Sequence, residues 1–254
     1  MQKVSVEPVP LGKHMGYDVR VLDEGATLQD YLAGMEEAIE KLPLTRRRCL
    51  GNGCRGCDAC CGERIPLTSI DLLRIYHRLS RDFHQQKGFL SVGISATKAS
   101  ACAKGLAQAK FSLETLAWHQ ALRRYGYVVA EGRKVDIIVR TGEDGRCVFL
   151  EPHSRLCGIY PVRPLVCRTY ICCPQTARVE RLRAEVVNLG EDQLVRDWLL
   201  DAAVRGAQPD FHEGYVAAPA RDDWPPTPFA EKRDYAEVLL KDVCSTKLWQ
   251  QLRS

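Results

Sequence analysis

Four cysteines lie within one short stretch of this chain, CRGCDACC, which spans residues 54–61. Two residues separate Cys54 from Cys57 and Cys57 from Cys60, and a tight loop with this spacing can turn three sulfur atoms toward one centre. Cys61 directly follows Cys60. Because adjacent side chains usually diverge, we expect these two thiols to reach different metal ions, or different irons of one cluster. The stretch is typical of a metal site.

A second group of thiols lies in residues 147–173, and it consists of Cys147, Cys157, Cys167, Cys172 and Cys173. With the first stretch, these residues supply enough sulfur for two centres of four thiolates each, of the zinc or the iron–sulfur type. One structural zinc takes only four ligands, so the surplus of thiols favours an iron–sulfur centre, with zinc as the alternative. We therefore predict that the two cysteine-rich loops converge on one metal centre, or on two.

A histidine offers a different ligand set. His153 lies between Cys147 and Cys157 and could complete a site of three thiolates and one imidazole. A histidine in a surface turn is the more common case, and it is the interpretation that we favour. Two cysteines, Cys102 and Cys244, stand apart from both groups, and we expect them to be buried structural thiols.

The composition of the chain fits a protein that works with reduced thiols. Its 254 residues are 45% apolar and 27% charged, enough to build a core without disulfides. Residues 1–16 lack the apolar core of a signal peptide, and no apolar stretch approaches the ~20 residues that span a bilayer. We expect a cytoplasmic protein that does not enter a membrane. The net charge of +4 is too small for this length to indicate nucleic-acid binding.

The elements that must position the thiols follow from the hydrophobic periodicity. Apolar residues at helical spacing predict helices over residues 27–42, 66–80, 112–126, 177–204 and 230–252. We expect the fourth of these helices to be broken near Gly190. Three β-rich runs separated by turn residues predict a small antiparallel meander over 127–151. Residues 1–25 indicate an extended lead-in or an edge strand, and residues 84–110 fit either a loop or a short helix.

The predicted fold class is α+β, with helices around the small antiparallel meander and the two cysteine-rich loops brought together from separate parts of the chain. We expect a single domain over residues 1–254. Within it, residues 45–175 would form the metal-binding core, and residues 176–254 a C-terminal helical extension.

The first stretch, followed by CVFLEPHSRLCGIYPVRPLVCRTYICC, resembles the YkgJ-type cysteine cluster family, a zinc- or iron-chelating CxxCxxCC domain. The residues that fill the family's pattern are Cys54, Cys57, Cys60, Cys61, Cys147, Leu150, Cys157, Ile159, Tyr160, Arg163, Pro164, Cys167 and Arg168. The resemblance covers residues 49–173. It implies metal chelation and leaves the metal open between zinc and iron.

Three residues beside the cysteines become candidate cofactor-binding residues because they match the same motif. Arg163 and Arg168 would form a cationic rim that stabilises thiolates and steers an anionic substrate or redox partner, and Tyr160 would shape the ligand loop. A more distant similarity to the cysteine domain of flagellin lysine N-methylases implies an iron–sulfur cluster and S-adenosylmethionine. The chain shows no glycine-rich strand-to-helix turn of the Rossmann kind for that cofactor.

The predicted function is that of a cytoplasmic metal-binding protein whose thiolates hold an iron–sulfur cluster of the [4Fe–4S] type, in one centre or two. Its role would be redox or modification chemistry with an unknown redox or protein partner. One alternative is a zinc protein in which the metal is structural and the surface binds a partner. The other is a cluster-dependent methyltransferase that uses S-adenosylmethionine. The sequence singles out no catalytic residue.

Overall fold

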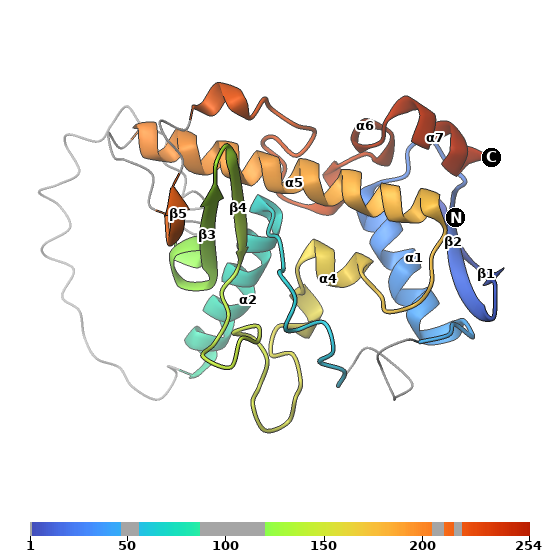
Figure 1. The fold of residues 1–254 in the computed structure, drawn as a ribbon, viewed down its shortest axis with the longest axis horizontal. Coiled ribbons are helices and arrows are strands. Elements are labelled where there is room, and N and C mark those ends of the chain that lie inside the picture. Colours follow the sequence, from blue (N-terminus) through green and yellow to red (C-terminus); the bar gives the residue numbers. More distant parts are fainter. Residues whose placement is uncertain (1, 47–55, 87–119, 205–210, 216–219) are drawn as a thin grey trace, which may run out of the picture.

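The computed structural model describes residues 2–46, 56–86, 120–204, 211–215 and 220–254 (Figure 1). The fold class is α+β, as predicted. Three cysteines, Cys49, Cys54 and Cys102, fall outside the described residues, together with most of the segment 84–110 and the first part of the helix predicted over 112–126. The rest of that helix is present, since residues 120–125 are helical and a strand follows at Gly126.

The chain begins with an antiparallel hairpin of β1 (Val4–Leu11) and β2 (His14–Val21). We predicted only an extended lead-in or one edge strand here. The turn is possible because Gly12 has a φ of 64°, in the left-handed region that residues with a side chain disfavour. The inward side chains of β2 are buried in one core with α1 (Leu28–Lys41).

Two helices begin with the same local device, the capping box. In α1 the Thr27 side chain accepts a hydrogen bond from the backbone N–H of Asp30, whose carboxylate accepts from the Thr27 N–H in return. Thr68 and Asp71 make the same pair of bonds, each 3.0 Å long, at the start of α2 (Ser69–Gln86). These two predicted helices are confirmed, and α2 starts a few residues after the first cysteine stretch.

The predicted meander forms only in part. β3 (Gly126–Glu131) and β4 (Lys134–Val139) pair antiparallel, but the run at 146–152 is not a third strand. Only its start lies beside the end of β4, where the Val148 N–H donates to the Arg140 carbonyl at 3.0 Å. Its other backbone bonds go to the cysteine loops: the N–H of Cys147 donates to the carbonyl of Cys61 at 2.7 Å, and the Phe149 carbonyl accepts from the N–H of Gly158 at 2.9 Å. The third position in the sheet, parallel to β3, belongs to β5 (Glu213–Tyr215).

The long helix α5 (Ala177–Val204) lies across both halves of the molecule (Figure 1). The predicted break near Gly190 does not occur. A Cβ atom on Gly190 would lie 2.6 Å from Cγ2 of Thr68 and 3.3 Å from the Phe229 ring, so the glycine lets α2 and the C-terminal segment approach the helix. The glycine at position 190 is therefore explained by close packing against the helix and not by an interruption of the helix.

The variant Gly190→Ala tests that explanation. In an open helix, alanine stabilises by up to ~1 kcal/mol over glycine, but here the added methyl group meets Thr68, and we expect a net loss of about 1–3 kcal/mol of unfolding free energy. Urea unfolding measures the difference. The control is Asn188→Ala, on the exposed side of the same helix, which should be neutral or slightly stabilising. A Gly190→Ala protein as stable as the control would contradict the close approach.

A carboxylate on α5 should make stability depend on pH. Burial, with the nearby charge of Asp136, raises the pKa of Glu191 to about 8, although its carboxylate accepts a hydrogen bond from the Ile137 N–H at 3.2 Å. Because the folded-state pKa lies above the ordinary value of 4.5, the folded protein binds more protons than the unfolded chain between those values. The stability from the neutral carboxyl is therefore complete below pH 4.5 and is lost as the pH rises through about 8.

The variant Glu191→Gln removes this titration. We expect it to match the parent protein at pH 5 and to be about 1–2 kcal/mol more stable at pH 9, after a discount for partial exposure. Urea unfolding at a series of pH values measures the effect, and Glu180→Gln, at an exposed position of α5, is the control. Parallel pH profiles for the parent and Glu191→Gln proteins would show that Glu191 does not titrate in this range.

The C-terminal region is not the single helix that we predicted over 230–252. After the short turn η3 (Arg221–Asp223), it contains three brief elements, η4 (Tyr235–Glu237), α6 (Leu240–Val243) and α7 (Thr246–Arg253). The chain between η4 and α6 pairs with the start of α1: the Leu240 N–H donates to the Ala26 carbonyl at 2.9 Å, and the Leu28 N–H donates to the Val238 carbonyl at 2.8 Å. These bonds replace the ones that a continuous helix would make.

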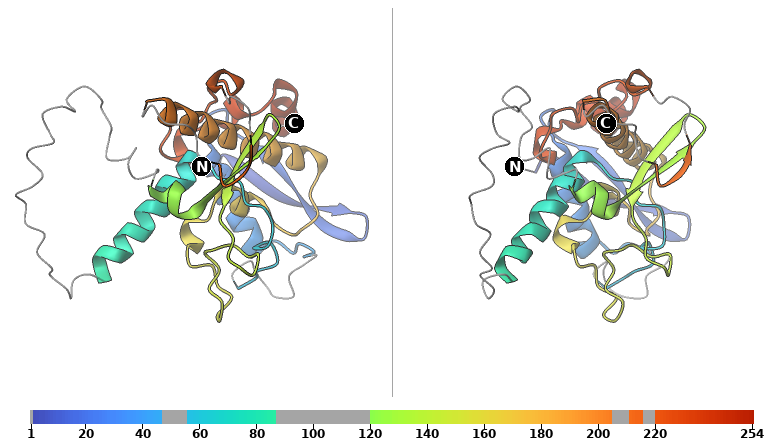
Figure 2. Two further views of the ribbon diagram at one scale, coloured as in Figure 1. Left: turned by 60° about the vertical axis from the view of Figure 1, so that its left-hand side comes forward. Right: turned by 90° about the vertical axis from the view of Figure 1, so that its left-hand side faces the viewer.

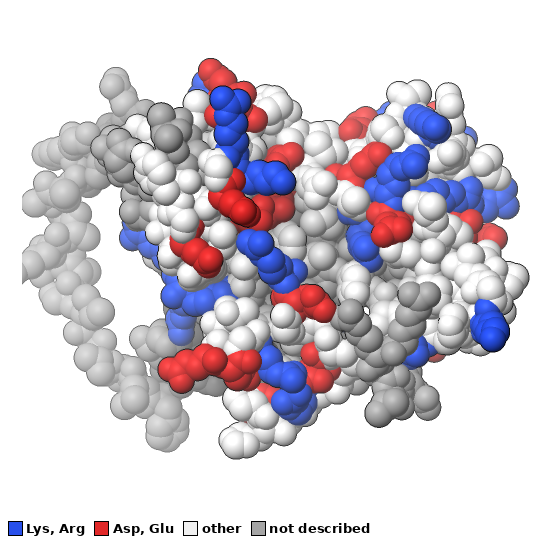
Figure 3. Space-filling view, in the orientation of Figure 1, with Lys and Arg blue, Asp and Glu red and all other residues white. Residues whose placement is uncertain are grey.

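Two hydrophobic cores share α5. Its first half packs with the N-terminal hairpin, α1 and the C-terminal helices, and its second half with α2 and the β3–β4 hairpin. The loop after β4 and the segment before α2 lie side by side at the end of the molecule away from α5 (Figure 2). On the face drawn in Figure 3, basic and acidic side chains are intermingled. Within the described residues, no helix combines the length and apolar character needed to cross a membrane.

Candidate metal centre

The second cysteine motif is carried by two short elements, η2 (Tyr160–Val162) and α4 (Leu165–Thr169). Pro164 directly precedes α4, where a proline costs no helical hydrogen bond. The Leu165 N–H at the start of α4 donates to Oδ1 of Asp71 at 2.9 Å. One buried carboxylate on α2 thus anchors the element that presents Cys167.

Asp71 also joins the C-terminal region to this anchor. Its Oδ1 accepts a hydrogen bond from the Tyr235 hydroxyl at 2.5 Å, and its Oδ2 accepts from the Thr68 N–H at 3.0 Å. Burial raises the pKa of Asp71, while the hydrogen bonds from Tyr235, Thr68 and Leu165 oppose that rise. Nothing in the sequence indicated that Asp71 has these remote partners.

A second acidic residue ties the two cysteine loops directly to each other. The carboxylate of Asp58, between Cys57 and Cys60, accepts hydrogen bonds from Arg146, directly before Cys147, and from Arg155, between Cys147 and Cys157. Its two ion pairs and the bond from Cys147 to Cys61 hold the loops side by side. The sequence signal for this role is only its place inside the cysteine stretch.

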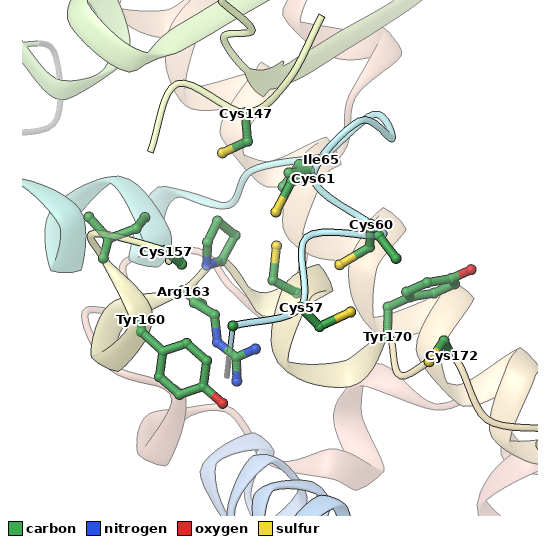
Figure 4. A pocket seen from close by; sticks show the side chains of 15 residues that line it. Cys57, Cys60, Cys61, Ile65, Cys147, Cys157, Tyr160, Arg163, Tyr170 and Cys172 are labelled. Carbon is green, nitrogen blue, oxygen red and sulfur yellow. The ribbon is translucent and has the colours of Figure 1, made fainter. Parts of the chain in front are cut away.

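The loops enclose one pocket, with a free volume of about 60 Å³. By the same measure one water molecule needs about 10–15 Å³, so the space exceeds that of a single ion. The thiols that line it come from both groups and are Cys57, Cys60, Cys61, Cys147, Cys157, Cys167 and Cys172. Figure 4 shows Cys57, Cys60 and Cys61 on one loop, with Cys147 on the neighbouring segment close to Cys61. No disulfide bond joins any two of the seven.

Among the described residues that line the pocket, Arg163 is the cationic one. Its guanidinium lies over the Tyr160 ring, 4.0 Å from the centroid, and both side chains line the pocket (Figure 4). The Nε atom of Arg163 is buried and has no hydrogen-bond partner among the described residues. A half-buried cation with an unused Nε donor fits a pocket that holds negative charge.

The other predicted site residues lie elsewhere. Arg168 is 3% exposed and does not line the pocket; its Nε donates to Glu36 on α1 at 2.8 Å. Cys173 lines a neighbouring hollow, which Cys172 shares. His153 is exposed, in agreement with a surface turn. Cys244 is half-buried against the first core, and burial raises its pKa to about 12, as expected for a structural thiol.

The thiols of the pocket differ in acidity. A hydrogen bond from the Cys61 thiol is the main cause that lowers the pKa of Cys60, with the charge of Arg163 adding to it, and the same bond raises the pKa of Cys61. Burial raises the pKa of Cys147 to about 11, and it also raises those of Cys157 and Cys167, against the opposing charge of Arg163. Because a metal binds the thiolate, its uptake would release protons from these thiols.

The donor set of the pocket fits the chemistry of zinc or an iron–sulfur cluster, since both take thiolates. In the described part of the chain, however, no three histidine, cysteine or acidic side chains are arranged as ligands of one ion. The structure brings the thiols to one pocket, and which of them bind metal stays a prediction. Cys54, the remaining member of the first stretch, lies outside the described residues.

Comparison with known proteins gives one match. No curated protein and no solved structure matches the chain. A family model named CxxCxxCC, described as "Putative zinc- or iron-chelating domain", matches residues 53–186. The match covers more than half of the chain and includes both cysteine loops, α2, β3, β4 and α4. The chain therefore belongs to the CxxCxxCC family, and this membership supports metal binding through its cysteines.

Proposed function

We propose that the pocket holds an iron–sulfur cluster of the [4Fe–4S] type, bound by thiolates from both cysteine loops and used in redox or modification chemistry in the cytoplasm. The observation that carries the proposal is a pocket with room for more than one ion and with seven thiols among its described lining residues. Its free volume of about 60 Å³ exceeds what a single ion needs, as a cluster of several irons and sulfides requires. Zinc and a [4Fe–4S] cluster each take four protein thiolates, so the remaining thiols leave ligands for a second centre.

The charge of the pocket supports the same proposal. A [4Fe–4S] cluster held by four thiolates has a net charge of about −2 in its oxidised form. Arg163 would offset part of that charge, and the Tyr160 ring beneath it keeps the guanidinium in place. Asp58 and Asp71 would act indirectly: Asp58 would hold the two loops in position, and Asp71 would hold α4. When bound, the cluster supplies electron transfer.

A further cavity, distinct from the hollow lined by Cys172 and Cys173, offers a path to the thiols. Cys60 and Cys167 line both the central pocket and a second cavity of about 370 Å³, whose other walls include Glu63, Arg64 and Tyr170. A redox partner or a substrate that approached here would come within reach of the cluster ligands. We propose this side of the molecule as the place where a protein partner or substrate meets the centre.

Structural zinc is the second candidate. The two loops contain little regular secondary structure, and they connect elements of both cores. A zinc ion held by four thiolates would staple such loops together. Methyl transfer from S-adenosylmethionine is a third candidate, for which the described residues add no specific support.

Metal and sulfide analysis after anaerobic purification separates these functions. We expect a brown protein with broad visible absorption and with iron and acid-labile sulfide in equal amounts. A colourless protein with stoichiometric zinc and no sulfide would replace the first candidate by the second. A titration with S-adenosylmethionine, followed by calorimetry on the same preparation, tests the third, and saturable binding is the result that would support it.

A further inference from the structure

The hollow lined by Cys172 and Cys173 has a free volume of about 570 Å³, within the range of pockets that bind small molecules. It lies where the end of β1 meets the chain between α4 and α5. Its other described lining residues include Leu11, Tyr170, Pro174, Gln175, Glu180 and Arg183. Three of these side chains are polar groups of different chemistry: a guanidinium, a carboxamide and a carboxylate.

The wall that carries Pro174 and Gln175 is held against β2 by backbone contacts. The Tyr17 N–H donates to the Pro174 carbonyl at 3.0 Å, and the Thr176 N–H donates to the Tyr17 carbonyl at 3.2 Å. A Cβ atom on Gly16 would lie 2.6 Å from the Pro174 carbonyl oxygen, so the two segments are in close contact. This wall of the hollow is therefore formed before any ligand binds.

Arg183 brings a positive charge to the hollow. Its guanidinium lies over the ring of Tyr170, 4.8 Å from the centroid. Such stacking uses the face of the guanidinium and leaves the N–H groups in its plane available. Within the described residues, no hydrogen bond or ion pair uses these groups, and the half-buried side chain has no nitrogen atom closed off from solvent. A fixed fork of donors of this kind suits a carboxylate, which accepts two parallel hydrogen bonds.

Gln175 and Glu180 add a further donor and an acceptor. Oε1 of Gln175 accepts a hydrogen bond from the Tyr17 hydroxyl at 2.8 Å, which orients the side chain and leaves its NH₂ group without a partner among the described residues. Glu180 lies three residues before Arg183 on α5, and residues at this spacing share one face of a helix. Its carboxylate makes no ion pair with Arg183 or with any other described residue. Donors for a negative group thus lie beside an acceptor for a positive one.

We propose that this hollow binds a free amino acid with an apolar side chain. Arg183 and the NH₂ group of Gln175 would bind its carboxylate, and Glu180 would bind its ammonium group. Leu11 and Pro174 would contact its side chain. A ligand with a single charge would complement only one of the two charged side chains, so a molecule that carries both charges fits the hollow best.

The site adjoins the proposed metal centre. Tyr170 and Cys172 line both the hollow and the thiol pocket, and Figure 4 shows the two residues next to each other. A bound amino acid would therefore lie beside a thiol of the centre. The proposal does not depend on the identity of the metal, because none of the groups assigned to the ligand is a thiol.

Isothermal titration of the full-length, metal-loaded protein tests the proposal at constant ionic strength. The probes are L-leucine, 4-methylpentanoate, which lacks the ammonium group of leucine, and 3-methylbutylamine, which lacks its carboxylate. We expect saturable binding of L-leucine to the parent protein, at least about tenfold tighter than that of either analogue, because each analogue loses hydrogen bonds between charged groups.

Two variants separate the roles of the charged side chains. Arg183→Gln should bind L-leucine at least about tenfold more weakly, whereas Arg181→Gln, at an exposed position of α5 outside the hollow, should stay within about twofold of the parent. Glu180→Gln, at an exposed position, should bind L-leucine about tenfold more weakly but bind 4-methylpentanoate as well as the parent or better, since a negative charge beside the carboxylate is removed. A damaged fold would not produce this contrast.

Several results would overturn the proposal. They are equal binding of L-leucine and 4-methylpentanoate by the parent protein, equal weakening by Arg183→Gln and Arg181→Gln, and loss of both probes in Glu180→Gln. Absence of saturable L-leucine binding to the parent protein would overturn it as well. Metal content is measured on every sample: a metal-loaded protein that does not bind L-leucine contradicts this proposal alone, and a protein that binds L-leucine without metal contradicts only the proposed metal centre.

Discussion

Cys167→Ser is expected to lose most of the bound metal, and Cys57→Ser is expected to lose as much. The two residues come from different loops, but both line the same pocket. A serine hydroxyl is a poor replacement for a thiolate ligand of zinc or of an iron–sulfur cluster. Because metal binding contributes folding free energy, we also expect both variants to unfold at a lower denaturant concentration than the parent protein. Metal analysis after anaerobic purification and urea unfolding measure the two effects.

The matched control for both variants is Cys244→Ser. This thiol is also half-buried, but it packs against the first core and does not line the pocket. The Cys244→Ser variant should retain the full metal content, although the substitution loses some packing energy. Full metal retention in Cys167→Ser beside complete loss in Cys57→Ser would show that the first loop binds the metal without the second. Our proposal of a centre shared by both loops would then be wrong.

Asp71→Asn should show the second large effect, because it alters a carboxylate that three parts of the chain share. In the variant one carboxylate oxygen becomes an amide N–H₂ group. If this group takes the place of Oδ2, it opposes the Thr68 N–H; if it takes the place of Oδ1, it opposes the Leu165 N–H. Either arrangement leaves a buried donor without an acceptor, which costs about 1–3 kcal/mol. We expect a loss of stability of this size or larger.

The same variant should weaken metal binding, since the Leu165 N–H and Asp71 fix the start of the helix that carries Cys167. We expect about a tenfold loss of metal affinity, as is common when a group that orients a ligand is removed. Competition with a chelator measures it. The control Tyr235→Phe removes one hydrogen bond to Asp71 and keeps the ring and the bonds to Leu165 and Thr68. If Asp71→Asn and Tyr235→Phe bind metal equally well, the anchor has no part in building the metal site.

Short-range patterns allowed a good part of this protein to be predicted. The periodicity of α1 and α2, the β3–β4 hairpin and the extent of α5 each depend on residues close together in sequence. The prediction of one C-terminal helix failed because the central residues of that segment form backbone hydrogen bonds with the start of α1 instead of with their own neighbours. The prediction of a third meander strand failed for a similar reason, since only the start of that run bonds beside the end of β4 and its other backbone bonds go to the cysteine loops.

The sequence by itself determined the kind of chemistry, because the spacing of the cysteines and the motif around Arg163 define the family and its thiol donors. Only the tertiary structure decided which thiols share a pocket, that Arg168 pairs with Glu36 instead of facing them, and that Asp58 and Asp71 hold the loops. The physical reason is the range of the interactions. A loop motif is written in neighbouring residues, whereas the partners of a buried charge depend on how distant segments pack, and no local pattern records that choice.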